Sequence, residues 1–335
     1  MNNEMEYVTI GKAGIRASRV GLGTWSIGGW MWGGTDESEA IATIHAAQDM
    51  GITLFDTAAV YGYGNSEEIV GRALAGGRRA KAVVATKCAL NWDEDGKVTR
   101  DGRKARVEKE IEDSLRRLQT DYIDIYQIHW PDPLVPIEET AGAMKALLDA
   151  GKIRAIGVSN YSVEQMERFA TVAPLHTSQP PFNLFERKAE RDILPYGAKH
   201  GIVGLTYGAL CRGLLSGTTK RDRVYQGDDL RQNDPKFQEP RFSHYLDAVE
   251  KLDALAQERY GKRVIDLAVR WILEQPGVGV ALWGARKPSQ LEAIPGSMGF
   301  TIDAATMGEI DRIIDGCVKE PVGPEFMAPP QRTAA

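Results

Sequence analysis

Short apolar runs of strand length alternate with amphipathic helical patterns along most of this chain. Between the runs, apolar residues recur three or four positions apart, as in Val107, Ile111, Leu115 and Leu118, which is typical of a helix with one buried face. Because strands and helices alternate, the pattern predicts an α/β protein built on a parallel sheet. The predicted strands are Val20–Gly23, Thr53–Phe55, Ala82–Ala85, Tyr122–Ile128, Ile153–Val158, His176–Ser178, Ile202–Thr206 and Val278–Leu282.

Three predicted helices end at a glycine that is followed directly by a predicted strand. Gly51, Gly151 and Gly201 occupy these junctions, in "QDMGITLF", "LDAGKIRAIGV" and "AKHGIVGLT". Glycine adopts the left-handed conformation that commonly ends a helix, because it has no Cβ to clash. Such tight helix-to-strand joins are typical of right-handed crossovers between parallel strands.

Eight strands alternating with helices favour a closed (β/α)8 (TIM) barrel over an open, doubly wound sheet. We expect a single domain over residues 1–335, with its core at about residues 8–314. The stretch up to Ser18 predicts an N-terminal hairpin that closes the bottom of the barrel. An extra helix is expected near Ala248–Arg259, and residues 320–335 are expected to form an irregular tail.

Composition and charge narrow the class of protein. The 335 residues are 43% hydrophobic and 26% charged, with a formal net charge of −5. These values favour a globular protein and argue against a nucleic-acid or membrane-surface partner. The three cysteines, Cys88, Cys211 and Cys317, are too few and too widely spaced to indicate a disulfide framework or a zinc site, so no metal is expected. The N-terminus carries no signal-like apolar segment, and the sequence predicts a cytoplasmic protein.

Polar residues follow the apolar runs at the points where the predicted strands end. Asp56 ends the second run, Lys87 the third and His129 the fourth, while Tyr61 follows Asp56 in a glycine-rich loop. In a barrel the carboxyl ends of all strands meet at one face, where active sites are built. Separately, these residues have ordinary interpretations as a turn cap, a solvated lysine, a core histidine and a loop aromatic. Together they form an acid–base set.

Four stretches carry a resemblance to a known family: "GITLFDTAAVYGYGNSEEIVGRAL", "VVATK", "SLRRLQTDYIDIYQIHWPD" and "AGKIRAIGVSNYS". They resemble the aldo-keto reductases, (β/α)8 barrels that reduce carbonyls with NADPH. The match extends from about Val8 to Ile314. Within the family, the chain most resembles the bacterial stress-related reductases and NADPH-linked glycerol dehydrogenases. The resemblance implies a catalytic tetrad of Asp56, Tyr61, Lys87 and His129.

The chemistry of the four side chains agrees with these implied roles. Hydride arriving at a carbonyl carbon leaves charge on the oxygen, so a donor must supply a proton there. We expect Tyr61 to be that general acid, with the Lys87 ammonium lowering the pKa of the phenol from its usual value of about 10. Asp56 would hold Lys87 charged, and His129 would orient the carbonyl by a hydrogen bond.

No G-x-G-x-x-G motif follows a strand, so a Rossmann-type cofactor site is not indicated. The family resemblance instead implies that Ser159, Asn160 and Gln179 contact the nicotinamide amide, with Tyr207 stacked on the ring. It places the pyrophosphate along "YGALCRGLLSG" and the adenosine phosphate at "WGARKPSQLEAI". Arg286, helped by Lys287, is expected to give a preference for NADPH over NADH. The other implied cofactor contacts are Gly23, Thr24, Trp25, Asp56, Leu210, Arg212, Gly213, Leu215, Gly217, Gly284 and Gln290.

Two features set this cofactor site apart. Many relatives carry an acid–amide pair where this chain has Ala293 and Ile294, which leaves the usual adenine contact in doubt. The polar stretch Thr218–Phe242 is longer than a normal connection. It is either a lid over the cofactor, which we favour, or a disordered surface insertion.

Tryptophans gather on the loops near the predicted mouth of the barrel. Trp25, Trp30 and Trp32 lie on the first of these loops, and Trp92 and Trp130 lie on neighbouring ones. Because exposed tryptophans are costly unless they line a pocket or an interface, we expect an aromatic wall around the substrate.

The leading interpretation is an NADPH-dependent oxidoreductase that interconverts small aldehydes or ketones and alcohols or polyols of the glycerol and glyceraldehyde type. A second hypothesis uses Lys87 as a Schiff-base nucleophile, since barrel aldolases also place a lysine at a strand end. A third is a non-enzymatic, cofactor-sensing subunit of the same fold. The expected partner is a small-molecule substrate, while the physiological substrate, the reaction direction and the oligomeric state stay open.

Overall fold

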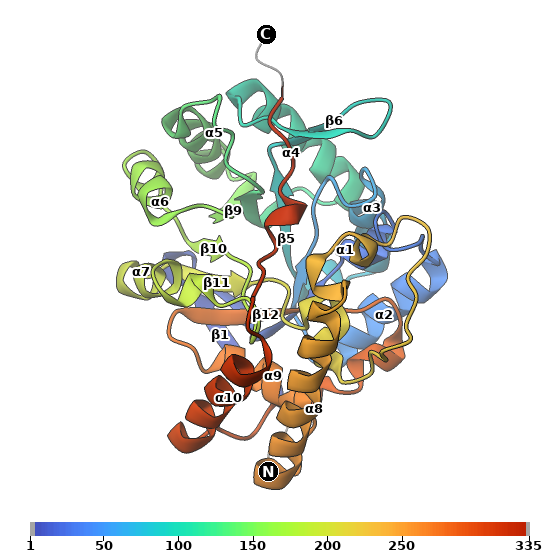
Figure 1. The fold of residues 1–335 in the computed structure, drawn as a ribbon. Coiled ribbons are helices and arrows are strands. Elements are labelled where there is room, and N and C mark those ends of the chain that lie inside the picture. Colours follow the sequence, from blue (N-terminus) through green and yellow to red (C-terminus); the bar gives the residue numbers. More distant parts are fainter. Residues whose placement is uncertain (1–3, 333–335) are drawn as a thin grey trace.

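Eight parallel strands close into a barrel in the computed structural model, which describes residues 4–332 (Figure 1). Each predicted apolar run forms one barrel strand, because strands buried on both faces are apolar along their whole length. Around the barrel the strands are β3 (Val20–Gly23), β4 (Leu54–Asp56), β5 (Val83–Cys88), β8 (Ile123–Ile128), β9 (Ile153–Ser159), β10 (Thr177–Gln179), β11 (Val203–Thr206) and β12 (Val278–Gly284). The predicted (β/α)8 barrel is confirmed.

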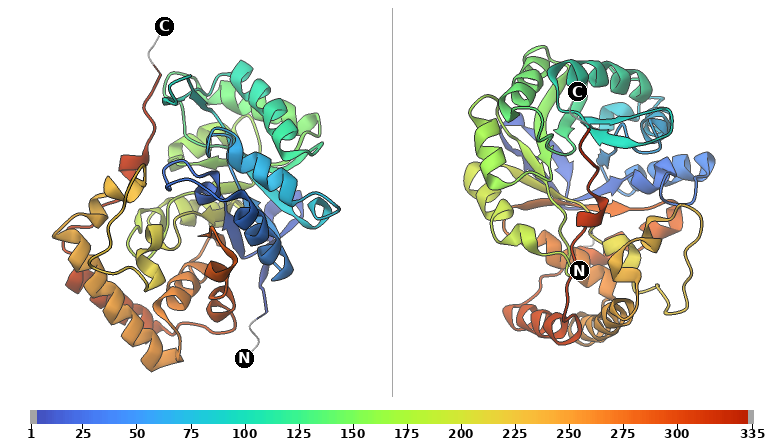
Figure 2. Two further views of the ribbon diagram at one scale, coloured as in Figure 1. Left: turned by 90° about the vertical axis from the view of Figure 1, so that its right-hand side faces the viewer. Right: turned by 45° about the horizontal axis from the view of Figure 1, so that its top comes forward.

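Helices surround the barrel, as the two views in Figure 2 show. Asp36 caps α2 by accepting from the Glu39 amide, and Ser162 and Gln165 form the predicted capping box of α6. Gly51, Gly151 and Gly201 have the expected positive φ, at 91°, 72° and 70°. The α-helices are α1 (Trp25–Gly28), α2 (Glu37–Asp49), α3 (Asn65–Ala73), α4 (Lys104–Leu118), α5 (Ile137–Asp149), α6 (Val163–Ala170), α7 (Ile193–His200), α8 (Arg241–Tyr260), α9 (Val264–Leu273) and α10 (Ala304–Cys317).

Short 3₁₀ helices occupy several of the connections. They are η1 (Gly11–Ala13), η2 (Arg79–Lys81), η3 (Lys188–Glu190), η4 (Cys211–Ser216), η5 (Leu230–Gln232), η6 (Pro235–Phe237), η7 (Pro288–Leu291), η8 (Ile294–Ser297) and η9 (Glu325–Met327).

The N-terminal hairpin closes one end of the barrel, as predicted. Strands β1 (Tyr7–Ile10) and β2 (Ile15–Ser18) pair antiparallel. Ile10, Ile15 and Ala17 pack with side chains from inside the barrel, among them Leu54 and Val280. Because this end is filled by side chains, the opposite, carboxyl end of the strands is the end left for a site.

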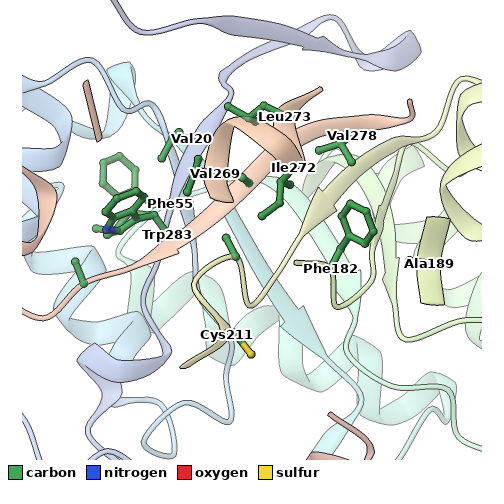
Figure 3. Close-up of a cluster of buried hydrophobic side chains, with 14 of the residues drawn as sticks. Val20, Phe55, Phe182, Ala189, Cys211, Val269, Ile272, Leu273, Val278 and Trp283 are labelled. Carbon is green, nitrogen blue, oxygen red and sulfur yellow. The ribbon is translucent and has the colours of Figure 1, made fainter. Parts of the chain in front are cut away.

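A larger hydrophobic core lies between the barrel and its helices. Figure 3 shows Val269, Ile272 and Leu273 of α9 beside Val20 of β3 and Val278 of β12. Burying each such side chain contributes roughly 1.5–3 kcal/mol, so this layer holds the strand ends in fixed positions.

The C-terminal segment after α10 crosses the front of the barrel in Figure 1, where it is drawn in red. It ends at a second hairpin, formed by β6 (Leu90–Trp92) and β7 (Val98–Arg100). There the Arg100 amide donates to Pro330 O at 3.2 Å, and Arg332 pairs with Asp132 at 2.7 Å. Residues 333–335 of the expected irregular tail lie outside the described residues. Among residues 4–332, no helix is long and apolar enough to cross a membrane.

Candidate active site

The carboxyl ends of neighbouring strands bring the predicted polar residues together. Asp56 is the last residue of β4, Lys87 lies one residue before the end of β5, and His129 directly follows β8. Ser159 and Gln179, at the ends of β9 and β10, face each other in register. Residues separated by more than 100 positions in the sequence therefore share one mouth.

Lys87 links the strand ends to the loop after β4. Its side chain is fully buried, and its Nζ donates to Asp56 Oδ1 at 2.6 Å, to Thr57 O at 2.9 Å and to Tyr61 Oη at 3.3 Å. Burial lowers the pKa of the Lys87 ammonium, and the Asp56 carboxylate opposes that shift. The lysine therefore stands between a carboxylate and a phenol inside the barrel mouth.

The loop that carries Tyr61 depends on two glycines. A Cβ on Gly28 would lie 2.8 Å from the Tyr61 carbonyl, and one on Gly62 would lie 2.2 Å from Gly28 O. Gly62 also has a φ of 62°, which favours glycine. The two loops can therefore touch, and the Trp25 ring stacks on Tyr61 with its centroid 5.9 Å away.

The pKa of the Tyr61 phenol is shifted in the direction opposite to the one expected. Burial and the Asp56 carboxylate raise the pKa of Tyr61 well above its usual value, whereas the sequence analysis expected Lys87 to lower it. The physical reason is that the Lys87 charge is already offset by Asp56, so the cost of burying a phenolate dominates. Tyr61 is thus firmly protonated.

His129 lies against Tyr61, with the two rings edge to face and 5.7 Å apart. Its main chain is held at both ends: its amide donates to Cys88 O, and its carbonyl accepts from Asn160 Nδ2, each at 3.0 Å. Burial, together with the Lys87 charge, lowers the pKa of the imidazole well below its usual value. The ring is therefore neutral and carries a single N–H to donate.

The side chains expected at the nicotinamide amide form one hydrogen-bonded chain. Tyr207 Oη donates to Asn160 Oδ1 at 3.0 Å, and Asn160 Nδ2 donates to Ser159 Oγ at 3.0 Å. Ser159 Oγ donates in turn to the main-chain oxygen of Gln179 at 2.8 Å, and Gln179 Nε2 donates to Asp56 Oδ2 at 2.7 Å. The chain connects these residues to the tetrad.

A cavity of about 1210 Å³ opens beside Asp56 and Tyr61. It exceeds the roughly 300–1,000 Å³ of ordinary small-molecule pockets and is lined by seven basic and five acidic side chains. This size and charge suit a dinucleotide with several phosphates. Of the predicted cofactor contacts, Gly23, Thr24, Trp25, Asp56, Tyr207, Leu210, Arg212, Gly213, Gly284, Arg286 and Gln290 line it, and so do Lys287 and Ala293.

Five predicted cofactor contacts do not line this cavity. Ser159, Asn160 and Gln179 belong to the hydrogen-bonded chain described above, and the other two are Leu215 and Gly217. The Leu215 side chain is fully buried in the hydrophobic core, because η4 turns it inward. Gly217 packs close to α9, where a Cβ would lie 2.8 Å from Val264. Ile294, beside Ala293, is also a core residue.

Arg212 lines the cavity, but its guanidinium is already engaged. It pairs with Glu186 and with Asp234 in a buried cluster that also contains Lys236, whose Nζ lies 2.8 Å from Glu186. The pKa of Glu186 is lowered, because Arg212 and Lys236 outweigh its burial. The Arg212 guanidinium is therefore held in an internal ion pair, and the pyrophosphate contact expected of this residue stays a prediction.

The segment 218–242 forms one wall of the cavity. Thr218, Lys220, Arg223, Tyr225 and Arg231 are among its lining residues. Asp228 accepts hydrogen bonds from the amides of Met31 and Gly33, at 2.8 and 2.9 Å, and Asp234 joins the buried cluster. The segment thus reaches across to the first loop, which is the placement expected of a lid.

The five tryptophans divide into two groups around Tyr61. Trp25 and Trp32 line the cavity and contact each other edge to face. Trp30, Trp92 and Trp130 pack with Tyr61 in a separate apolar cluster that contains Val60 and Leu90. Aromatic side chains therefore surround the phenol on several sides.

Residues 19–315 match the Aldo/keto reductase family. The chain belongs to this family. It is therefore an oxidoreductase enzyme that uses a nicotinamide cofactor and acts on a small-molecule carbonyl compound. These conclusions agree with the resemblance found in the sequence.

Several relatives of this aldo/keto reductase are similar along nearly their whole length. The aldo-keto reductase YhdN of Bacillus subtilis is 60% identical over 98% of this chain and 99% of its own. The NADH-specific methylglyoxal reductase of Escherichia coli is 35% identical, over 93% of this chain and 100% of its own. The solved structure of a glycerol dehydrogenase from Gluconobacter oxydans has 53% identity and a TM-score of 0.86, covering 98% of this chain and 100% of that one.

Sequence reasoning missed three buried polar residues near this reductase site. Glu186 and Asp234 hold Arg212, and Gln127 donates to Asp56 Oδ2 at 3.3 Å. Gln127 is the single uncharged polar residue in the run "YIDIYQI", Tyr122–Ile128, apart from the tyrosines. That interruption of a buried strand was the available signal.

Proposed function

We propose that this reductase uses NADPH to interconvert small polar aldehydes or ketones and their alcohols, with Tyr61 as general acid and base. The observation that carries the proposal is the position of Lys87 Nζ, 2.6 Å from Asp56 Oδ1 and 3.3 Å from Tyr61 Oη. Asp56 and Tyr61 also line the large cavity. The proposed acid, Tyr61, therefore lies next to its cationic partner, Lys87, and next to a cavity large enough for the cofactor.

The four side chains divide the proton chemistry among them. When bound, the reduced cofactor supplies the hydride. Tyr61, protonated because its pKa is raised, donates its phenolic proton to the carbonyl oxygen as charge develops there. Lys87 stabilises the phenolate left behind, and Asp56 keeps Lys87 charged and directed at Tyr61. The neutral His129 ring donates its N–H to the same oxygen and orients the carbonyl.

The cofactor would be held by residues that line the cavity and by the hydrogen-bonded chain that meets the cavity at Asp56 and Tyr207. Ser159, Asn160 and Gln179 would bind the nicotinamide amide, next to Tyr207. Arg286 would bind the 2′-phosphate, since a guanidinium can meet a phosphate with two hydrogen bonds. One relative carries a name that states NADH specificity, so the family alone does not imply a preference for NADPH, and the proposal rests on Arg286 of this chain.

Polyols of the glycerol and glyceraldehyde type are the proposed substrates. Their small size suits the aromatic surroundings of Tyr61, and the glycerol dehydrogenase of Gluconobacter oxydans shares 53% of its residues with this chain.

The proposed location is the cytoplasm. All three cysteines are free thiols, which supports a reducing setting.

The Schiff-base hypothesis has less support. A lysine must lose its proton to attack a carbonyl, and Lys87 is instead buried in an ion pair with Asp56.

A panel of small carbonyls and alcohols, assayed with NADPH and NADH and with NADP⁺ and NAD⁺, tests the proposal. Turnover of glyceraldehyde or glycerol with the phosphorylated cofactor is expected. Turnover confined to NADH, or the absence of any cofactor-dependent reaction, would overturn it.

A further inference from the structure

The Asp56 carboxylate accepts from three side chains, and the proposed function explains only two of them. Oδ1 accepts from Lys87 Nζ at 2.6 Å. Oδ2 accepts from Gln179 Nε2 at 2.7 Å and from Gln127 Nε2 at 3.3 Å. Lys87 is the partner of Tyr61, and Gln179 belongs to the proposed nicotinamide site. Gln127 has no such role, although it is fully buried.

We propose that Gln127 is a positioning residue, which holds the Asp56 carboxylate in the orientation that directs Lys87 at Tyr61. The inference rests on the proposed function. A carboxylate held by one strong ion pair can still rotate about the Cβ–Cγ bond. Donors to both of its oxygens fix the plane of the group. Gln127 supplies such a donor from β8, the strand on the far side of β5 from β4.

The position of Gln127 is costly, which argues that its amide serves a purpose. Its Oε1 is buried without a hydrogen-bond partner among the described residues, and a buried carbonyl left without a donor is unfavourable. An apolar side chain would avoid that penalty in a strand where Ile123, Ile125 and Ile128 are all buried. The amide cannot simply turn over, because Oε1 would then face the Asp56 carboxylate.

Gly157 on β9 makes room for this glutamine. A Cβ at Gly157 would lie 2.8 Å from Gln127 Cγ, 3.1 Å from Oε1 and 2.2 Å from Thr177 Oγ1. Gly157 does not have the positive φ that calls for glycine. Space for the neighbouring side chains is therefore the reason for a glycine here, and Gly157 leaves room for both Thr177 and Gln127.

A second donor also protects Asp56 when the cofactor binds. Gln179 is the residue proposed to turn toward the nicotinamide amide, and that contact competes with its bond to Asp56. Gln127 lies deeper in the barrel, because it is level with Gly157 and Thr177, two residues before Gln179 on β10. It therefore remains available to Oδ2 in both situations.

The test compares Gln127→Met, which keeps the shape and removes the donor, with the control Thr177→Val. Thr177 Oγ1 is likewise buried without a partner, in the same part of the barrel, but Thr177 makes no contact with Asp56 among the interactions found in residues 4–332. For Gln127→Met we expect kcat to fall roughly tenfold, the effect of losing one hydrogen bond, with KM nearly unchanged. Thr177→Val should keep the wild-type kcat. Gln127→Glu should recover activity as the pH falls, because a protonated carboxyl group can donate in place of the amide.

A cofactor-free measurement separates this inference from the proposed function. In the Asp56→Asn background, Gln127→Met removes an unpaired oxygen without removing a bond to a charge. Its effect on Tm should therefore be more favourable there than in the wild-type background, by about 2 °C or more. Equal Tm effects in both backgrounds, or a wild-type kcat for Gln127→Met, would overturn the role of Gln127. Absence of turnover in the wild-type protein would instead overturn the proposed function, and the Tm comparison would still decide on Gln127.

Discussion

The Arg286 guanidinium donates from Nη1 to the main-chain oxygen of Trp32 at 2.7 Å, and its Nη2 donates to the carbonyl of Gly34. The residue proposed to bind the 2′-phosphate thus joins the segment after β12 to the loop after β3. Asp228 holds the same loop from the other side, through the amides of Met31 and Gly33. A phosphate must therefore compete with two carbonyl oxygens for Arg286.

Arg286→Ala should weaken NADPH binding and leave NADH binding nearly unchanged. A phosphate contact in a partly exposed site is worth about 1.5–3 kcal/mol, or roughly ten- to a hundredfold in affinity. Fluorescence titration with both cofactors measures the effect. An equal loss for NADPH and NADH would show that Arg286 supports the Trp32 loop and does not recognise the phosphate.

Arg286→Lys serves as the matched variant. It keeps the positive charge but loses the planar fork that reaches both carbonyl oxygens. If charge alone selects NADPH, the lysine variant will retain most of the preference. If two hydrogen bonds are needed, it will resemble the alanine variant.

Tyr61→Phe should lower kcat by about 10²- to 10⁴-fold, the contribution of a well-placed general acid, and leave cofactor affinity close to wild type. Tyr63→Phe is the control, because Tyr63 lies in the same loop but its hydroxyl donates to Gly96 O at the surface. Steady-state kinetics of both variants test whether Tyr61 is the general acid. Turnover retained in Tyr61→Phe would remove Tyr61 from the proton transfer.

Lys87→Met should abolish most reduction and also destabilise the protein. It leaves the Asp56 carboxylate buried without its cation, and breaking a buried ion pair in this way costs about 3–5 kcal/mol. The variant that also carries Asp56→Asn should regain much of that stability without regaining activity. Denaturant unfolding and kinetics on the two proteins test both halves. A fully stable Lys87→Met protein would contradict the ion-pair role.

The same variant has a consequence for pH. Alcohol oxidation needs the Tyr61 phenolate, whose formation burial and Asp56 already oppose. Without Lys87 the phenolate loses its cationic neighbour, so oxidation should begin at a higher pH than in the wild type. An unchanged pH profile with an altered KM would make Lys87 a binding residue.

The barrel and the meeting of Asp56, Lys87 and His129 at its mouth were predictable because both leave local signals. A strand buried on both faces is an unbroken apolar run, and Asp56, Lys87 and His129 each stand where such a run ends. The β6–β7 hairpin was missed, since each of its strands has only three residues. Only three of its six residues are apolar, namely Leu90, Trp92 and Val98, and three are too few to show a period.

Long-range partners and burial explain what the sequence did not reveal. The ion-pair partners of Arg212 are Glu186 and Asp234, which are 26 and 22 residues away, so no local pattern shows that its guanidinium is engaged. The direction of the Tyr61 pKa shift depends on how deeply the phenol is enclosed, and a list of neighbouring charges does not contain that information. The contact made by Gln127 was missed for the same reason, because its partner Asp56 is 71 residues away.

His129 should make the cofactor-free protein less stable as the pH falls below about 6.5, the usual pKa of histidine. Its pKa in the folded protein is lowered by burial and by Lys87, so below that pH the unfolded chain binds a proton that the folded protein does not. The contribution of His129 therefore leaves the free energy of unfolding unchanged above about pH 6.5. Below that pH it lowers the free energy of unfolding, by at most about 1.4 kcal/mol per pH unit. His129→Gln should flatten this slope between pH 7.5 and 5.5. Thermal unfolding of the wild type and the variant across this range provides the test, and parallel slopes would mean that His129 takes up a proton in the folded state.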